Sequence, residues 1–133
     1  MRAYVQRQTG LLLRRFATQA THTARTADAD AIHDLRVAIR RLSRCLRVFG
    51  QFYPAGSWKP VRRRLADLMD LCGSVRDCDI AIDLLKQAGV RVTAPLVRQL
   101  RAKRRAAAQE LQLELQGWKV RSVSRQWRMR LEL

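Results

Sequence analysis

Apolar residues recur every three or four positions along most of this chain, and this spacing constrains the fold more than any other feature. The clearest case is residues 32–49, whose apolar row is Ile32, Leu35, Ile39, Leu42, Leu46 and Phe49. Such spacing places side chains on one face of an α-helix, whereas a half-buried strand alternates apolar and polar residues. No segment alternates in this way over a useful length. We therefore expect an all-α protein.

Residues 32–49 also carry a second row, which is basic and has the same spacing. Its members are His33, Arg36, Arg40, Arg44 and Arg47. At about 100° per residue, the centre of the basic row lies roughly 120° from the centre of the apolar row. The cations therefore lie beside the buried seam rather than opposite to it, and Val37 and Val48 border their other side. A row of cations between two apolar edges indicates a groove that holds a polyanion.

Capping residues and helix breakers set the expected ends of the first two helices. The first helix spans roughly residues 3–26. Asp28 or Asp30 is a suitable N-cap for the second helix, and both acids favour the positive end of a helix dipole. The second helix is expected to run to about Gln51, because residues 53–56 (YPAG) contain a proline and a glycine that break it.

The second half of the chain is also helical in its spacing. Ser57 is expected to cap a third helix and Gly73 to interrupt it, so that a further short helix carries residues 75–87. Thr93 is expected to cap the fourth long helix, with Pro95 in its first turn. The core row of that helix is Val97, Leu100, Arg104, Ala107, Leu111 and Leu115, and a basic row of Arg98, Arg101 and Arg105 lies one position on. Lys59, Arg62 and Arg76 can join the basic rows from the region of the third helix.

Short connections make neighbouring helices antiparallel. The whole chain, residues 1–133, is therefore predicted to form a single antiparallel four-helix bundle with basic rows beside its core seam. Residues 119–133 keep five basic residues together with Trp127 and Leu131. They are either a last amphipathic segment or a flexible basic tail.

The charge balance favours an anionic partner. The sequence contains 27 basic and 11 acidic residues, a formal net charge of +16, and 23 of the basic residues are arginine. Arginine presents a planar fork of donors that binds phosphate oxygens in pairs. A net charge of this size destabilises a compact state unless an anion offsets it. The alternatives are that codon bias explains the arginines as surface charge, or that Asp34, Asp67 or Asp70 pair with them.

The three cysteines do not make a disulfide framework, because their number is odd. Cys45 and Cys72 fall on or near apolar faces and are expected to be small buried thiols. A reducing, cytoplasmic compartment follows. Cys72 and Cys78, with His22 and His33 elsewhere, match no familiar zinc spacing, so we expect no metal and no cofactor.

Targeting segments are not evident in the sequence. No run approaches the roughly 18 apolar residues of a membrane helix, so no membrane is expected as a partner. The first 27 residues are Arg-rich and free of acids. This composition also fits a mitochondrial presequence, but we favour a structural first helix.

Residues 33–42 (HDLRVAIRRL) strongly resemble the signature helix of the CHAD family, the conserved histidine α-helical domain. A second block resembles the same family, with residues 58–63 (WKPVRR) followed by residues 73–80 (GSVRDCDI). The order and separation of the two blocks are also similar to those of the family. The resemblance covers roughly residues 3–115.

The resemblance implies a helical protein that binds inorganic polyphosphate along a basic channel. Family members are associated with polyphosphate granules, often adjoin triphosphate-hydrolysing tunnel enzymes, and are not themselves known as catalysts. The motifs carry over His33, Arg36, Arg40 and Arg41 from the first block, and Arg62, Arg63 and Arg76 from the second. Asp77 and Asp79 also match, and we interpret them as acids that pair with a motif arginine or cap a helix start.

The chain departs from the family pattern in two ways. A full family domain contains two related helical bundles, and this chain has the length of about one, a half-domain. It is then a homodimer that rebuilds the two-bundle groove, a truncated fragment or a solitary half-domain, and a twofold homodimer would supply two equivalent basic faces. Ala66 stands where the family often places a basic residue, so that contact is expected to be absent.

These observations predict non-enzymatic binding of inorganic polyphosphate along an Arg-rich helical groove. The predicted binding residues are His33, Arg36, Arg40, Arg41, Arg44, Arg47, Lys59, Arg62, Arg63, Arg76, Arg98, Arg101 and Arg105. No nucleophile or paired carboxylates accompany His33, whose other role would be a local hydrogen bond at the helix start. The expected location is the cytoplasm, at polyphosphate granules and in contact with granule proteins. Two alternatives stay open, a nucleic-acid-binding helical protein and an accessory subunit of a polyphosphate- or triphosphate-processing enzyme.

Overall fold

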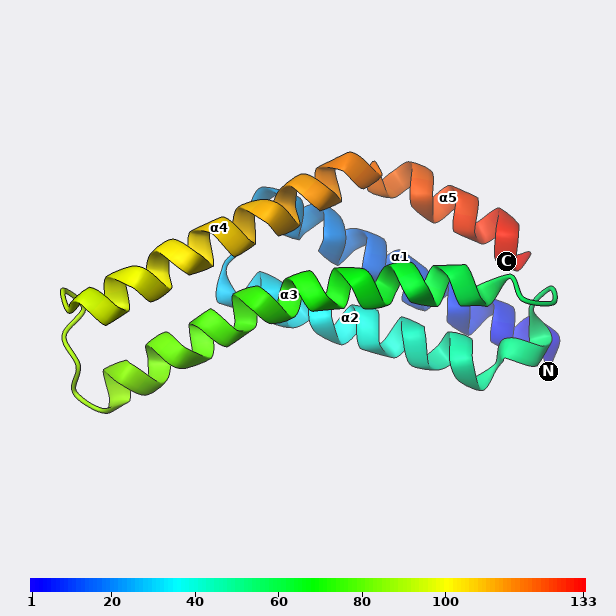
Figure 1. The fold of residues 1–133 in the computed structure, drawn as a ribbon. Coiled ribbons are helices and arrows are strands. Elements are labelled where there is room, and N and C mark those ends of the chain that lie inside the picture. The colour runs from blue at the N-terminus through cyan, green and yellow to red at the C-terminus, as the bar shows by residue number, and fades with distance from the viewer.

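The computed structural model describes all residues, 1–133, and is built only from helices (Figure 1). In chain order they are α1 (Arg2–Arg25), α2 (Ala29–Val48), the short 3₁₀ helix η1 (Gly50–Phe52), α3 (Trp58–Gln87), α4 (Pro95–Trp118) and α5 (Val120–Leu131). α1 and α2 form a hairpin, α3 returns along α2, and α4 and α5 pack on both α3 and α1. The all-α prediction is confirmed. The bundle has five α-helices rather than four, because its fourth side is divided between α4 and α5.

α2 begins directly after the turn that follows α1, as the sequence predicts. α2 follows Asp28, whose carboxylate accepts a hydrogen bond from the Ala31 N–H at 2.8 Å. This bond satisfies one of the four backbone donors that the start of a helix leaves free, so Asp28 is the N-cap. At its other end α2 stops at Val48, short of the expected Gln51, and η1 turns the chain toward α3.

α3 is continuous through Gly73, so the predicted interruption there is wrong. The helix runs for 30 residues, and the buried side chains on either side of the glycine, Cys72 and Val75, both face the core. One glycine inside a helix costs only about 1 kcal/mol relative to alanine. Burial of α3 side chains from Val61 to Cys78, on both sides of the glycine, offsets this cost.

Two predicted helix caps are not made. Ser57 precedes α3, but its hydroxyl donates to the Pro54 carbonyl at 2.6 Å instead of accepting from the helix. Thr93 lies before the N-cap position of α4, which is Ala94 and forms no side-chain hydrogen bond. Pro95 occupies the first turn of α4, as predicted, because its missing N–H is not needed there.

The C-terminal segment is the amphipathic helix α5. Lys119 has a left-handed backbone conformation, with φ of 49°, and turns the chain between α4 and α5. α5 then buries Val120, Val123, Trp127 and Leu131. Of the two alternatives for residues 119–133, the structure therefore has the amphipathic segment.

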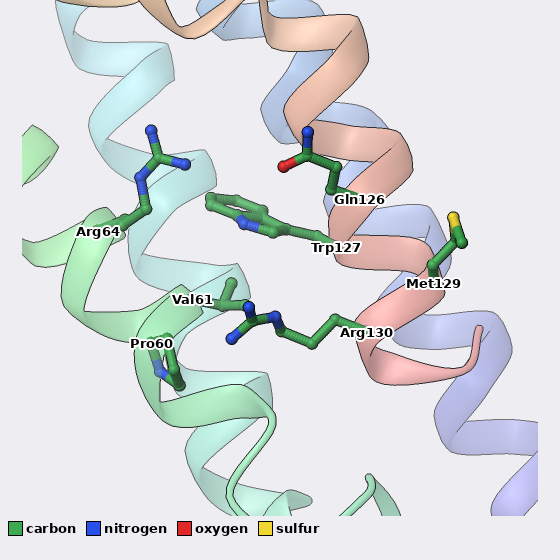
Figure 2. A pocket seen from close by; sticks show the side chains of 7 residues that line it. All are labelled: Pro60, Val61, Arg64, Gln126, Trp127, Met129 and Arg130. Atoms are coloured by element: carbon green, nitrogen blue, oxygen red, sulfur yellow. The ribbon is translucent and has the colours of Figure 1, made fainter.

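An aromatic cluster joins α5 to the core of 24 buried residues. The ring centroid of Phe16 on α1 lies 5.8 Å from that of Trp127 and 6.3 Å from that of Trp118. Arg64 of α3 holds its guanidinium 4.2 Å from the Trp118 centroid, a cation–π contact. Figure 2 shows Trp127 pointing from α5 toward α3, with Arg64 and Arg130 beside it. These three residues line a pocket of about 320 Å³. The aromatic and cation–π contacts hold α5 against α1, and α4 against α1 and α3.

The structure also bears on the expected state of the cysteines and on the expected absence of a membrane-spanning helix. All three cysteines are buried and free, which confirms the prediction for Cys45 and Cys72. Among the helices, none combines the length and the apolar character that crossing a bilayer requires.

α3 and α4 continue past the α1–α2 turn and form an arm, residues 80–103, at one end of the molecule (Figure 1). Arg104 marks the base of the arm, because it pairs with Asp79 at 2.6 Å and donates to the Ala27 carbonyl at 2.8 Å. None of the 24 core residues comes from the arm, and Val97 is its only buried residue.

We expect the arm to open locally before the rest of the bundle unfolds. Few buried apolar contacts oppose this opening, and such regions exchange their amide hydrogens at lower free energy than the core. Native-state hydrogen exchange should show the amides of residues 80–87 and 96–103 exchanging well before those of residues 61–75. Equal protection of the two sets would show that the arm unfolds together with the core.

Candidate functional site

A groove between α2 and α3 brings together four of the predicted cations. Arg40, Arg44 and Arg47 come from successive turns of α2, and Arg62 comes from α3. The groove has a volume of about 580 Å³. Its other lining residues are Ile39, Ser43, Val48, Ala66, Met69 and Asp70. The lining thus contains four cations and a single carboxylate.

The groove follows from the antiparallel packing of α2 on α3. Leu42 and Leu46 of α2 and Leu65 and Leu68 of α3 are buried and fix the distance between the two helices. Residues on the flanks of this seam then form two facing walls. The three α2 arginines lie about one turn apart, or about 5.4 Å along the helix axis. The wall therefore presents regularly spaced positive charges.

No carboxylate neutralises the four groove arginines. The whole structure contains two ion pairs, Arg2–Glu132 and Arg104–Asp79, and both lie outside the groove. Asp70 lines the groove but forms no ion pair. The alternative in which nearby aspartates pair with these arginines is therefore not what the structure shows.

Arg62 is held on the α3 wall by two contacts. Its Nε donates to the Ser43 hydroxyl of α2 at 3.1 Å, and its guanidinium lies 6.0 Å from the Trp58 ring centroid. A guanidinium that is already oriented loses less side-chain entropy when it binds an anion. Arg62 therefore presents a preorganised donor to the groove.

Arg36 lies deeper than the other members of the α2 basic row. It is half-buried, and its Nε is fully buried without a hydrogen-bond acceptor. Burial raises the pKa of the nearby Cys72 thiol on α3 to about 12, while the positive charge of Arg36 acts in the opposite direction. A buried donor without an acceptor costs about 1–3 kcal/mol. The unpaired Nε of Arg36, between α2 and α3, therefore lowers the stability of the folded protein.

The other predicted cations do not line this groove. Arg41 lies on the other flank of α2, in a pocket with Arg15 of α1 and Asp34. Arg101 and Arg105 line a third pocket, beside the ion pair at the base of the arm. His33, Lys59, Arg63 and Arg98 are exposed and Arg76 is half-buried, and none of these five lines any of the three pockets. The structure therefore divides the predicted basic row among several surfaces.

Three residues that shape the groove are absent from the predicted binding residues, namely Ser43, Met69 and Asp70, and the sequence suggests Asp70 only as an alternative ion-pair partner of the arginines. The signal that could have found the two on α3 is spacing, because residues 62, 66, 69 and 70 share one helix face. Ala66 lies on this wall, so the basic residue that the family often has there would add a cation to the groove.

Asp79 pairs with Arg104 and not with a motif arginine. The sequence places Arg104 in the core row of its helix, and the side chain does point inward. It reaches the α1–α2 turn, where the Asp79 carboxylate and the Ala27 carbonyl accept its hydrogen bonds. The two charged side chains are 23% and 18% exposed, so this pair secures the base of the arm in a partly desolvated position.

Comparison with known proteins identifies the family. A search of curated proteins and a search of solved structures each find no match. The family model of the CHAD domain matches residues 7–132, which is nearly the whole chain and includes α5. The chain therefore belongs to the CHAD domain family, whose domain is known from proteins connected with polyphosphate and triphosphate.

Proposed function

We propose that this protein binds inorganic polyphosphate in the α2/α3 groove and does not transform it. The observation that most supports this is the presence of four arginines in one groove without a carboxylate partner. Guanidinium groups bind phosphate oxygens in pairs, through hydrogen bonds roughly twice as strong as neutral ones. Such binding would bring the protein to polyphosphate granules in the cytoplasm. Phosphate release from polyphosphate by the purified chain would contradict the non-enzymatic part of the proposal.

Electrostatics is expected to supply much of the affinity. Polyphosphate carries about one charge per phosphate, as a nucleic acid strand does, and binding releases its condensed counterions. If each of the four groove arginines displaces one counterion, the logarithm of the binding constant falls with the logarithm of salt concentration with a slope of about −3. A flat salt dependence would not fit this groove.

The groove favours a polyanion without bases over nucleic acid. No aromatic side chain lines it, whereas proteins that bind single strands stack bases on aromatic rings for about 1–3 kcal/mol per base. In a competition experiment with labelled polyphosphate, unlabelled polyphosphate should displace the label at about tenfold lower phosphate concentration than single-stranded DNA or RNA. Equal displacement at equal phosphate concentration would favour the nucleic-acid alternative.

A further inference from the structure

α1 and α5 pack side by side and carry positive charge without any acidic residue. Together they contain nine arginines, and the 11 acidic residues of the chain all lie in other segments. Only one of the nine is neutralised, because Arg2 pairs with Glu132 at 3.2 Å. Folding brings these like charges together, and a bound anion would offset their repulsion.

A pocket of about 470 Å³ lies between α1 and α5, and three guanidinium groups line it. Arg7 and Arg14 come from α1, and Arg128 comes from α5. Gln8 adds a neutral amide, and no acidic side chain lines the pocket. Arg7 and Arg14 are exposed and form no ion pair, so their donors are available to a ligand.

Gly10 fixes the position of Arg128 in this pocket. The Arg128 Nη2 donates to the Gly10 carbonyl at 3.2 Å, and Gly10 stands between Arg7 and Arg14 on α1. A Cβ at Gly10 would already stand 3.5 Å from the Arg128 Nη1, so a side chain larger than alanine would displace the guanidinium. A cation from α5 is thus held against the backbone of α1, beside two cations of α1.

This pocket and the α2/α3 groove lie on opposite sides of the bundle. Around the bundle, α1 packs on α2, α2 on α3, α3 on α4 and α5, and these two pack on α1 (Figure 1). The two sites share no residue. We propose that the α1/α5 face is a second polyphosphate-binding surface, and that one protein chain thereby links two polyphosphate strands. This inference rests on the proposed function of the α2/α3 groove.

A bridging experiment with the full chain tests the second surface. Long-chain polyphosphate is immobilised by one end, saturated with protein and washed, and a fluorescent long-chain polyphosphate is then added. Wild-type protein is expected to retain the fluorescent strand. The variant Arg7→Gln/Arg14→Gln is expected to bind the immobilised strand nearly as wild type does but to retain about tenfold less fluorescent strand, because two charged contacts are lost from the second surface.

Two further variants separate the possible explanations. Lys86→Gln/Arg91→Gln removes the same charge from the arm, and it should bridge strands as wild type does. Arg40→Gln/Arg44→Gln should also lose bridging, because a strand held on its α1/α5 surface leaves only the weakened groove for the second strand, so undiminished bridging by this variant would refute the groove and not the second surface. Circular dichroism should show unchanged helical content in all three variants.

Three results would overturn the inference. The first is a wild-type protein that retains no second strand. The second is undiminished bridging by Arg7→Gln/Arg14→Gln, which is what a homodimer that bridges through two α2/α3 grooves would give. The third is an equal loss of bridging in Lys86→Gln/Arg91→Gln, which would show dependence on net charge alone.

Discussion

Replacing Arg40 and Arg44 by alanine is expected to weaken polyphosphate binding about 100-fold at physiological salt. A hydrogen bond to a charged group contributes about 1.5–3 kcal/mol, and 1.4 kcal/mol corresponds to a tenfold change in affinity. Both side chains line the groove, are exposed and form no ion pair, so their loss removes ligand contacts but few contacts within the fold. Titration at several salt concentrations should also show a slope shallower by about 1.4.

The matched control is Lys86→Ala/Arg91→Ala, which removes two charges from the arm. These residues act on the groove only through long-range electrostatics, which is screened beyond a Debye length of about 8–10 Å at physiological salt. We therefore expect an affinity close to that of the wild-type chain. Alanine is the best helix former, so the groove variant should keep its helical content. Unchanged affinity of the folded Arg40→Ala/Arg44→Ala variant would mean that the groove is not the binding site.

Trp127→Ala is expected to lower the free energy of unfolding by about 3–5 kcal/mol, a large share of the 5–15 kcal/mol typical of a domain. Trp127 is 4% exposed, and its ring centroid lies 5.8 Å from those of both Phe16 and Trp118. Truncation would leave a cavity where α1, α4 and α5 meet, and would also remove aromatic pairs worth about 0.5–1.5 kcal/mol each. Urea unfolding followed by circular dichroism measures the loss.

Met129→Ala provides the comparison on the same helix. Met129 is 76% exposed, so its truncation should change the free energy of unfolding by less than about 0.5 kcal/mol. Together the two variants ask whether α5 belongs to the cooperative core. If Trp127→Ala were as stable as the wild-type chain, residues 119–133 would behave in solution as the flexible basic tail.

The helix faces could be predicted from the sequence because they depend on local spacing. Ile32, Leu35 and Ile39 are buried as their row requires, and Asp28 caps α2 through a donor only three residues away. The continuity of α3 could not be predicted in the same way. Gly73 has a weak local preference against helix, and the burial of distant parts of α3 against other helices overrides it.

The partners of the site residues depend on tertiary packing, which spacing does not contain. Arg40 and Arg41 are neighbours in the sequence, yet a rotation of about 100° sends the first to the α3 side of α2 and the second to the α1 side. The partners of Arg104 were equally hidden, because Asp79 and Ala27 lie 25 and 77 residues away in the sequence. The basic row could therefore be predicted from the sequence, but the distribution of its residues over several surfaces could not.

Because the protein has few ion pairs, its lifetime in the cell is expected to depend on the anions around it. With 27 basic residues, 11 acidic residues and two ion pairs, its folded state carries a formal net charge of +16 that only external anions compensate. A ligand that binds only the folded state adds about 2.7 kcal/mol of stability at 100 times its dissociation constant. Proteases remove the unfolded fraction, so the chain should persist in cells rich in polyphosphate and turn over faster once that reserve is spent. If the pulse-chase half-life of the protein were unchanged by polyphosphate depletion, this link between protein turnover and phosphate storage would be wrong.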